Sequence, residues 1–310
     1  MSYKLVEGEV RLFYESTRLV GSRPDGDSVW FKPDNPDLLA DIGGRGAYFN
    51  KGGFTQLRFE GIDALELHYP GNLHQLTGPA VAARDYLLAA LGFDRDRVEY
   101  TPSDDIPTTV HESYPVKVRA SIMTRAIDRY GRPVVFVFAG RAPERSGSEV
   151  FLDARRLDQS INAALIRTGH AYPAFYTARQ VYGERVGGLP GDLRKYLTML
   201  SVIAQMTGRG VWQHDASTRD VTVTRRGDLT QLAIWPKLYR RLVKYYDDET
   251  ADHRSLHGFI DWLRADRTER DDFVIVLSIG EMLNLSDILT VSNTTIRMNY
   301  PPSGFVVIAR

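Results

Sequence analysis

The stretch that most constrains the fold is residues 57–66, which read Leu-Arg-Phe-Glu-Gly-Ile-Asp-Ala-Leu-Glu. Its first four residues alternate between apolar and charged, which is the period-two pattern of a half-buried strand. Gly61 interrupts the pattern, as a glycine does where a strand bends or where two backbones approach closely. The stretch therefore predicts a strand that carries a cation, Arg58, and that is followed by two carboxylates, Asp63 and Glu66.

These residue types at one strand end suit chemistry on a phosphodiester. The planar guanidinium of Arg58 can hold two phosphate oxygens. One carboxylate can hold a hard metal ion, while the other acts on a water molecule. The alternative interpretation is a strand end with ordinary surface charges, since charged side chains are normally exposed. Two further motifs favour the first interpretation.

Residues of the same kinds occur at two other predicted turns. Residues 25–29 read Asp-Gly-Asp-Ser-Val, and Asp-Gly is a hairpin turn signal. Residues 128–132 read Asp-Arg-Tyr-Gly-Arg and separate apolar runs at 116–123 and 134–138, which predict the strands of a second hairpin. Each is an ordinary turn by itself. Together the three segments place aspartates, a glutamate and two arginines at the ends of successive strands.

The order of these motifs resembles the staphylococcal-nuclease-like (thermonuclease) family. The resemblance covers about residues 16–215, because residues 161–169 (Ile-Asn-Ala-Ala-Leu-Ile-Arg-Thr-Gly) and a Gly-Val-Trp element at 210–212, followed by Asp215, also match that family. It implies an α+β protein that contains a five-stranded OB-type β-barrel with packed helices.

The resemblance implies catalytic roles for three residues. Arg58 and Arg132 match the two arginines that grip the phosphate, and Glu66 matches the residue that acts as general base for the attacking water or positions it. Fixed guanidinium donors stabilise the charge that the transition state adds to the phosphate oxygens. Leu65 departs from the family, which has a proline at this position, so the approach to Glu66 is expected to be less rigid.

The resemblance also implies one bound calcium ion. Asp27 and Asp63 match the metal-binding carboxylates of the family, and the backbone carbonyl of Ala64 matches its third protein ligand. Asp25 is expected to lie nearby and to act on the ion through other ligands or water. Ligands that are all oxygen and that leave room for water suit Ca²⁺.

Three further residues match the substrate pocket of the family. Tyr130 matches a tyrosine of the nucleotide pocket, Arg129 replaces a lysine beside it, and Phe175 falls near a second aromatic residue of that pocket. The aromatic side chains of residues 170–176 can stack on a base. They can equally close the core of the barrel, and the sequence leaves both alternatives open.

By resemblance, the protein is a calcium-dependent, sugar-nonspecific endonuclease. Such an enzyme hydrolyses DNA or RNA, breaks the bond to the 5′ oxygen and leaves 3′-phosphate ends. The alternative is a catalytically weak OB module that binds nucleic acid or a protein partner, since some members of the family have lost their site. The filled set of carboxylates and arginines favours the enzyme.

Composition limits where nucleic acid can bind and where the protein works. The chain has 39 basic and 39 acidic residues, so any attraction for nucleic acid must be local to a groove. Cysteine is absent, which is compatible with a reducing compartment. We expect no membrane association and no signal peptide, because no apolar run has the required length or position. These observations predict a cytoplasmic protein.

The sequence predicts two domains. Residues 1–215 are expected to form the staphylococcal-nuclease-like OB-fold domain, with 1–15 as an N-terminal extension at a sheet edge. Residues 94–115 are expected to be an insertion, either a surface excursion or a lid beside the active site. Residues 216–310 are expected to form a small α+β domain that mediates homo-oligomerisation or docks a protein partner. Because a cytoplasmic nuclease threatens its host, we hypothesise gating by low calcium, by the insertion or by the C-terminal domain.

Overall fold

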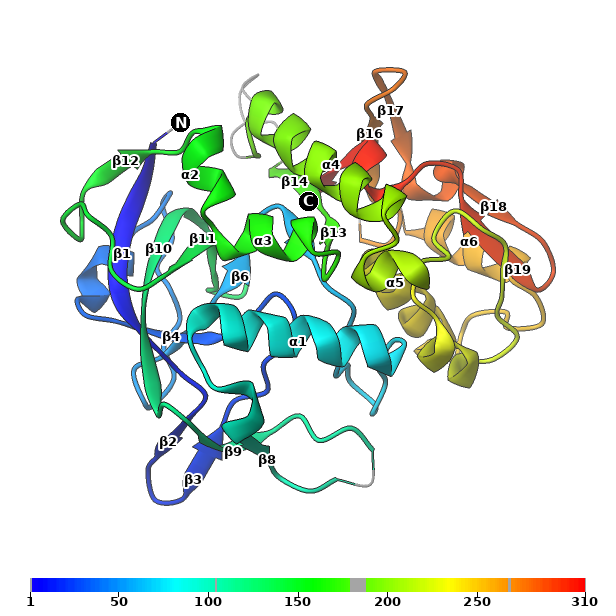
Figure 1. The fold of residues 1–310 in the computed structure, drawn as a ribbon. Helices are drawn as coiled ribbons and strands as arrows, with labels where there is room; N and C mark the ends of the chain where they lie inside the picture. Colours follow the sequence, from blue (N-terminus) through cyan, green and yellow to red (C-terminus); the bar gives the residue numbers. More distant parts are fainter. Residues whose placement is uncertain (1, 104, 179–187, 267–268, 310) are drawn as a thin grey trace.

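The computed structural model describes residues 2–103, 105–178, 188–266 and 269–309. The chain has a mixed α+β fold with two hydrophobic cores (Figure 1). We call them the first core, which includes Leu57, Phe59, Phe136, Leu165 and Phe175, and the second core, which includes Tyr172, Trp235, Leu238, Phe259 and Phe305. The first core fills the N-terminal part of the chain, and the second core lies mainly in the C-terminal part.

The largest sheet is barrel-like. Its strands follow the order β5 (Thr55–Gln56), β4 (Trp30–Pro33), β1 (Ser2–Arg11), β10 (Lys117–Ile127), β11 (Pro133–Ala139) and β6 (Arg58–Phe59), and β12 (Glu149–Phe151) pairs with β1. Only Leu57 separates β5 from β6 in the chain, yet these strands stand at opposite ends of the order. One short run of chain therefore pairs with β4 on one side and with β11 on the other, and the sheet is nearly closed.

Strand β1 corrects the prediction that residues 1–15 form an added edge. It pairs antiparallel with β10 along one side and with β4 along the other, so it is an interior strand of the sheet. Gly8 lies where β1 meets β4. A Cβ atom there would lie 2.3 Å from the carbonyl oxygen of Lys32 and 2.5 Å from the ring of Phe31. The close pairing of these strands therefore requires a glycine.

The Asp-Gly-Asp motif does not form the tip of a hairpin as predicted. The first hairpin is instead β2 (Phe13–Glu15) with β3 (Leu19–Gly21), and residues 22–29 connect β3 to β4. Gly26 lies against two other segments, because a Cβ atom there would be 2.6 Å from Cβ of Ala64 and 2.7 Å from Cβ of Ala83. The glycine thus lets this connection approach the segment that carries Asp63 and Glu66.

The region between residues 94 and 115 has its own structure. The 3-10 helix η2 (Arg95–Arg97) leads into a hairpin of β8 (Val98–Tyr100) and β9 (Val110–Ser113). The loop of this hairpin is held near helix α1 (Thr77–Leu91), because Arg84 donates to the carbonyl oxygen of Pro107 at 3.2 Å. The surface excursion is therefore a packed hairpin, and the lid alternative stays a prediction.

Helices of the N-terminal part pack against the barrel-like sheet and against each other. Helix α1 ends at Gly92, which takes the left-handed conformation with φ +106° that a glycine adopts without strain. Helical structure between residues 154 and 167 is interrupted at Ser160, whose hydroxyl accepts a hydrogen bond from the N–H of Ala163 and so begins a new helix. The helical elements are η1 (Pro36–Leu39), α2 (Ala154–Asp158), α3 (Ile161–Arg167), α4 (Gly191–Met206) and η3 (Gly210–Gln213).

The C-terminal part combines small sheets with α-helices, as expected for an α+β unit. One sheet has the order β14 (Phe175–Ala178), β20 (Phe305–Ala309), β16 (Phe273–Val276) and β17 (Glu281–Asn284), and another has β15 (Val221–Thr222), β19 (Thr295–Met298) and β18 (Leu289–Val291). The helical elements are η4 (Arg226–Gln231), α5 (Pro236–Asp247), α6 (His257–Ala265), η5 (Leu285–Ile288) and η6 (Pro302–Gly304). None of the helices in the described ranges is long and apolar enough to cross a membrane.

Residues 172–178 join the two parts of the chain. Strand β13 (Tyr172–Pro173) pairs with β7 (Ile62–Asp63), and β14 pairs in parallel with β20 from the end of the chain. A strand of the expected first domain therefore belongs to a sheet of the expected second one. Figure 1 shows these strands near the middle of the molecule, between the barrel-like sheet and the orange and red C-terminal strands.

We predict that Asn162→Ala destabilises the protein by about 2–4 kcal/mol, because it leaves buried backbone groups unpaired. The fully buried Asn162 accepts from the N–H of Val137 at 3.0 Å and donates to the carbonyls of Glu60 and Val135 at 2.9 Å. Urea unfolding measures the change. The exposed Asn293→Ala is the control and should shift stability by less than about 0.5 kcal/mol; equal effects would contradict the assigned role.

Candidate functional site

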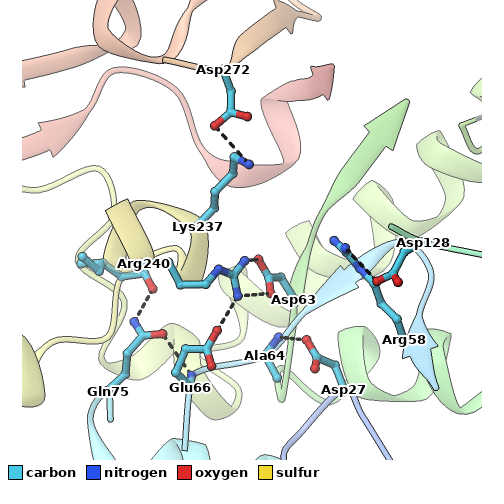
Figure 2. A network of polar contacts seen from close by, with 11 residues as sticks. Asp27, Arg58, Asp63, Ala64, Glu66, Gln75, Asp128, Lys237, Arg240 and Asp272 are labelled. Carbon is cyan, nitrogen blue, oxygen red and sulfur yellow. Dashed lines mark hydrogen bonds and ion pairs between the residues drawn. The ribbon is translucent and has the colours of Figure 1, made fainter. Parts of the chain in front are cut away.

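The predicted carboxylates come together just past the end of β6. Gly61, with φ +80°, turns the chain into β7, and Asp63, Ala64 and Glu66 follow. Asp27 reaches this segment from the β3–β4 connection, since its Oδ2 accepts the N–H of Ala64 at 3.0 Å (Figure 2). Two of the three predicted loops, far apart in the chain, thus meet at this point.

Asp27 is a half-buried carboxylate that lies among the other acidic side chains of this cluster. Burial raises the pKa of Asp27 well above its usual range, and the neighbouring carboxylates of Asp25, Asp63 and Glu66 raise it further. Asp25 lies beside it and accepts hydrogen bonds from the N–H of Asp27 at 3.3 Å and from the hydroxyl of Ser28 at 2.8 Å. Asp25 therefore shapes the loop and adds negative charge, which matches its expected place near the cluster.

A residue from the C-terminal part, Arg240 of α5, binds two of these carboxylates. Its Nη1 donates to Asp63 Oδ1 at 3.1 Å and its Nη2 donates to Asp63 Oδ2 at 2.7 Å, so both carboxylate oxygens are engaged. Nη1 also donates to Oε1 of Glu66 (Figure 2). The sequence analysis missed this residue, because an arginine among the charged positions of an amphipathic helix carries no signal of its partner.

Glu66 is held from its backbone as well as from its side chain. Its N–H donates to Oε1 of the fully buried Gln75 at 3.1 Å, and Nε2 of Gln75 donates to the carbonyl oxygen of Ile234 at 2.8 Å. Burial raises the pKa of Glu66 to about 7, against the lowering effect of the Arg240 charge. The carboxyl of Glu66 is therefore held in place and titrates near neutral pH.

The two predicted phosphate-binding arginines meet at one carboxylate. Nε of Arg132 lies 2.8 Å from Oδ2 of Asp128, and Nη1 of Arg58 lies 3.9 Å from the same oxygen. Oδ1 of Asp128 accepts the backbone N–H groups of Tyr130 and Arg132 at 2.9 Å and so fixes the turn. The guanidinium groups remain partly exposed, with side-chain exposures of 36% for Arg58 and 29% for Arg132. They form a half-open site for an anion.

Tyr130 lies on the surface beside these arginines. Its side chain is 63% exposed, and its hydroxyl accepts a hydrogen bond from Nη2 of Arg129 at 2.8 Å. The guanidinium carbons of Arg129 and Arg132 lie 4.9 Å and 5.4 Å from the centre of its ring. An exposed ring between two cations is suited to stacking on a base next to a phosphate.

Phe175 lies in the first core and not in an open pocket. It is 2% exposed, so the core-closing alternative describes its position. The next residue, Tyr176, faces the site instead. Its ring lies 4.9 Å from the guanidinium carbon of Arg58 and 5.4 Å from Nζ of Lys237. Burial raises the pKa of the Tyr176 hydroxyl, as does the charge of Asp63, so this tyrosine joins the carboxylate group to the arginine group.

The carboxylates offer the oxygen ligands that a hard cation prefers. In this structure, however, Asp63 and Glu66 bind the guanidinium of Arg240. Asp27, Asp63 and the carbonyl of Ala64 offer only oxygen donors, which is the ligand type of Ca²⁺. The described ranges contain no group of three or more His, Cys, Asp or Glu side chains in metal-binding arrangement. In this structure both oxygens of Asp63 bind Arg240 instead.

We predict that Gln75→Met lowers the free energy of unfolding by about 2–3 kcal/mol. Methionine keeps the shape of the side chain but leaves the N–H of Glu66 and the carbonyl of Ile234 without their partner. Thermal unfolding followed by circular dichroism measures the loss. Gln205→Met, at an exposed position of α4, is the matched control. If both variants melt with the wild type, Gln75 does not support the site.

No protein-family model matches this chain, and no curated protein matches it. The resemblance to the staphylococcal-nuclease-like family therefore rests on the motifs and stays a hypothesis about their chemistry.

Proposed function

We propose that this protein is an endonuclease that hydrolyses phosphodiester bonds of DNA or RNA, on an OB-type barrel as in the staphylococcal-nuclease-like family. The observation that carries the proposal is that Arg58 and Arg132 meet at one oxygen of Asp128, while Tyr176, whose ring lies against Arg58, also lies within range of the charge of the buried Asp63. A site with two half-exposed guanidinium groups and a buried carboxylate has the parts needed to bind a phosphate and to activate water.

Arg58 and Arg132 would bind the scissile phosphate. Asp128 is an internal stand-in for that anion, since both arginines already point at one of its oxygens. The ring of Tyr176 lies against Arg58 and limits its motion. Donors that are fixed before the reaction stabilise the charge that develops on the phosphate oxygens, and each is worth on the order of 3–4 kcal/mol.

Glu66 would take the proton of the attacking water. The water oxygen then bonds to phosphorus, the bond from phosphorus to the 5′ oxygen breaks, and the leaving oxygen takes a proton from solvent. A carboxylate whose pKa burial has raised to about 7 is a stronger base than an exposed one and is still ionised in part at neutral pH. Gln75 holds the backbone of Glu66 in position, since its Oε1 accepts the N–H of Glu66.

Asp27, Asp63 and the carbonyl of Ala64 would hold one calcium ion, with Asp25 beside them. When bound, such an ion supplies Lewis-acid polarisation of the phosphate and a template for the water. Tyr130 and Arg129 would hold the nucleotide next to the scissile phosphate, since they expose a ring and a cation beside Arg132.

The second candidate is a module that binds nucleic acid or a protein partner without cleaving it. The observation that favours it is the pairing of Arg240 with Asp63 and Glu66, which occupies the carboxylates that catalysis needs. A direct cleavage assay separates the two candidates, because the binding module would retain nucleic acid and leave its length unchanged.

We predict that Arg58→Ala, Arg132→Ala and Glu66→Gln each lower the rate of plasmid and RNA cleavage by about 10²- to 10³-fold, because each removes a group that acts in the transition state. Cleavage is measured on gels with calcium present, and melting temperatures show that the variants fold. Arg95→Lys, at an arginine with 64% side-chain exposure in η2, is the control and should cleave as the wild type does. A set of variants that all cleave normally would refute the proposed site.

We predict that a chelator selective for calcium stops cleavage and that added Ca²⁺ restores it, since the proposed ligands are all oxygens. The same gel assay follows the reaction with EGTA and with EGTA plus excess calcium. Undiminished cleavage in the chelator would overturn the metal assignment and would leave the roles of the arginines in place.

A further inference from the structure

Arg240 occupies the side of Asp63 that a bound cation would need. Both carboxylate oxygens of Asp63 accept hydrogen bonds from the guanidinium, at 3.1 Å and 2.7 Å. Calcium binds carboxylate oxygens at about 2.3–2.6 Å and repels a neighbouring positive charge. The guanidinium and a divalent cation therefore compete for Asp63 in both space and charge.

The contact also engages Glu66, so one side chain engages two of the residues proposed for the reaction. It comes from a helix 177 positions further along the chain than Asp63. Four carboxylates, Asp25, Asp27, Asp63 and Glu66, lie close enough to influence one another, and Arg240 is the cation whose side chain bonds to Asp63 and Glu66.

The structure allows the Arg240 side chain to leave Asp63 while helix α5 stays in place. The helix is anchored by buried apolar residues of the second core, including Leu238 and Leu242, and by ion pairs of Lys237 and Arg241 with Asp272, at 3.1 Å and 2.6 Å. These anchors do not involve Arg240. The Arg240 side chain is 26% exposed, so it has a route to solvent. Release therefore requires a change of side-chain rotamer and not a separation of the two parts of the chain.

We propose that Arg240 is a built-in competitor of the divalent cation, so that calcium binds Asp63 only in the fraction of molecules whose Arg240 has swung away. This inference rests on the cation site of the proposed function and adds a regulatory contact that a residue of the C-terminal part makes. The arrangement lowers the apparent calcium affinity by the fraction of molecules in the open state. It keeps Asp63 and Glu66 paired and the site inactive when free calcium is scarce.

The test is direct calcium binding to the full chain without substrate, by calorimetry and by the luminescence of Tb³⁺ as a calcium substitute. We expect Arg240→Gln to bind calcium at least about 10-fold more tightly than the wild type, as for an open state populated below about 10%. Arg241→Gln is the matched control, because it breaks the ion pair of the next residue with Asp272 and leaves Asp63 untouched. The control should keep the wild-type affinity.

A second variant keeps the test decisive if Arg240→Gln fails to fold. Arg240→Lys keeps the charge but cannot make the bidentate contact with Asp63, so its calcium affinity should lie between those of the wild type and Arg240→Gln. Asp63→Asn in the Arg240→Gln background should remove the gain. Calcium affinity that stays equal or falls in both Arg240 variants would overturn the proposal and would make Arg240 a support of the site.

The cleavage assay separates the failure of this inference from the failure of the proposed function. If the wild type cleaves with calcium but the Arg240 variants bind it no better, the competition is refuted and the nuclease stands. If the variants gain calcium affinity but no form of the protein cleaves nucleic acid, the competition stands and the nuclease does not.

Discussion

The arrangement of the site depends on the ion pair between Asp63 and Arg240. Asp63 is almost fully buried, and removing its charge from water is costly unless a partner of opposite charge is in place. Arg240 supplies that partner from α5, and it reaches Glu66 with the same guanidinium. The position of the C-terminal part is thus tied to the electrostatics of the site, because a shift of α5 would leave buried carboxylates unpaired.

The barrel-like sheet provides the rigidity that this pairing needs. Strands β5 and β6, at the two ends of the nearly closed sheet, lie in one short run of chain, and the same run continues through Gly61 into the carboxylate segment. Asn162 ties the backbone of Glu60 to that of Val135 and Val137 and so connects α3, β11 and the strand end. The carboxylate segment therefore comes soon after Glu60, whose backbone N–H and carbonyl groups are hydrogen-bonded to β11 and α3, which suits groups that must keep a fixed geometry.

Local patterns in the sequence predict local structure well in this chain. Helix α1 with its Gly92 cap, the β10–β11 pair with its turn, and α4 follow from periodicity and turn residues. The convergence of Asp27, Ala64 and Asp63, and of Arg58 with Arg132, follows from the motifs. The position of an element that depends on distant partners cannot be predicted in this way, because the residue pattern of a strand does not show which strands it pairs with. The interior position of β1 and the parallel pairing of β14 with β20 are of this kind.

The sequence analysis missed some residues of the site for the same reason. Asp128 is a typical turn residue in its sequence context, and its role as the shared partner of Arg58 and Arg132 depends on the return of β6 to β11. Arg240 looks like any charged residue of an amphipathic helix, although its side chain bonds to two buried carboxylates. Tyr176 and Phe175 are adjacent aromatics, and only the pairing of β14 decides which of them faces the site.

The charges of the site are thus satisfied from within the molecule. Asp128 is the anion for the two arginines, and Arg240 is the cation for Asp63 and Glu66. A phosphodiester would replace the first partner and a divalent cation the second, so each ligand exchanges with a group of its own sign. Exchange of this kind costs less than desolvating an unpaired charge. In the proposed function, this exchange would let a chain with no net charge bind a polyanion, because Arg58 and Arg132 would become available only where the phosphate and the cation bind.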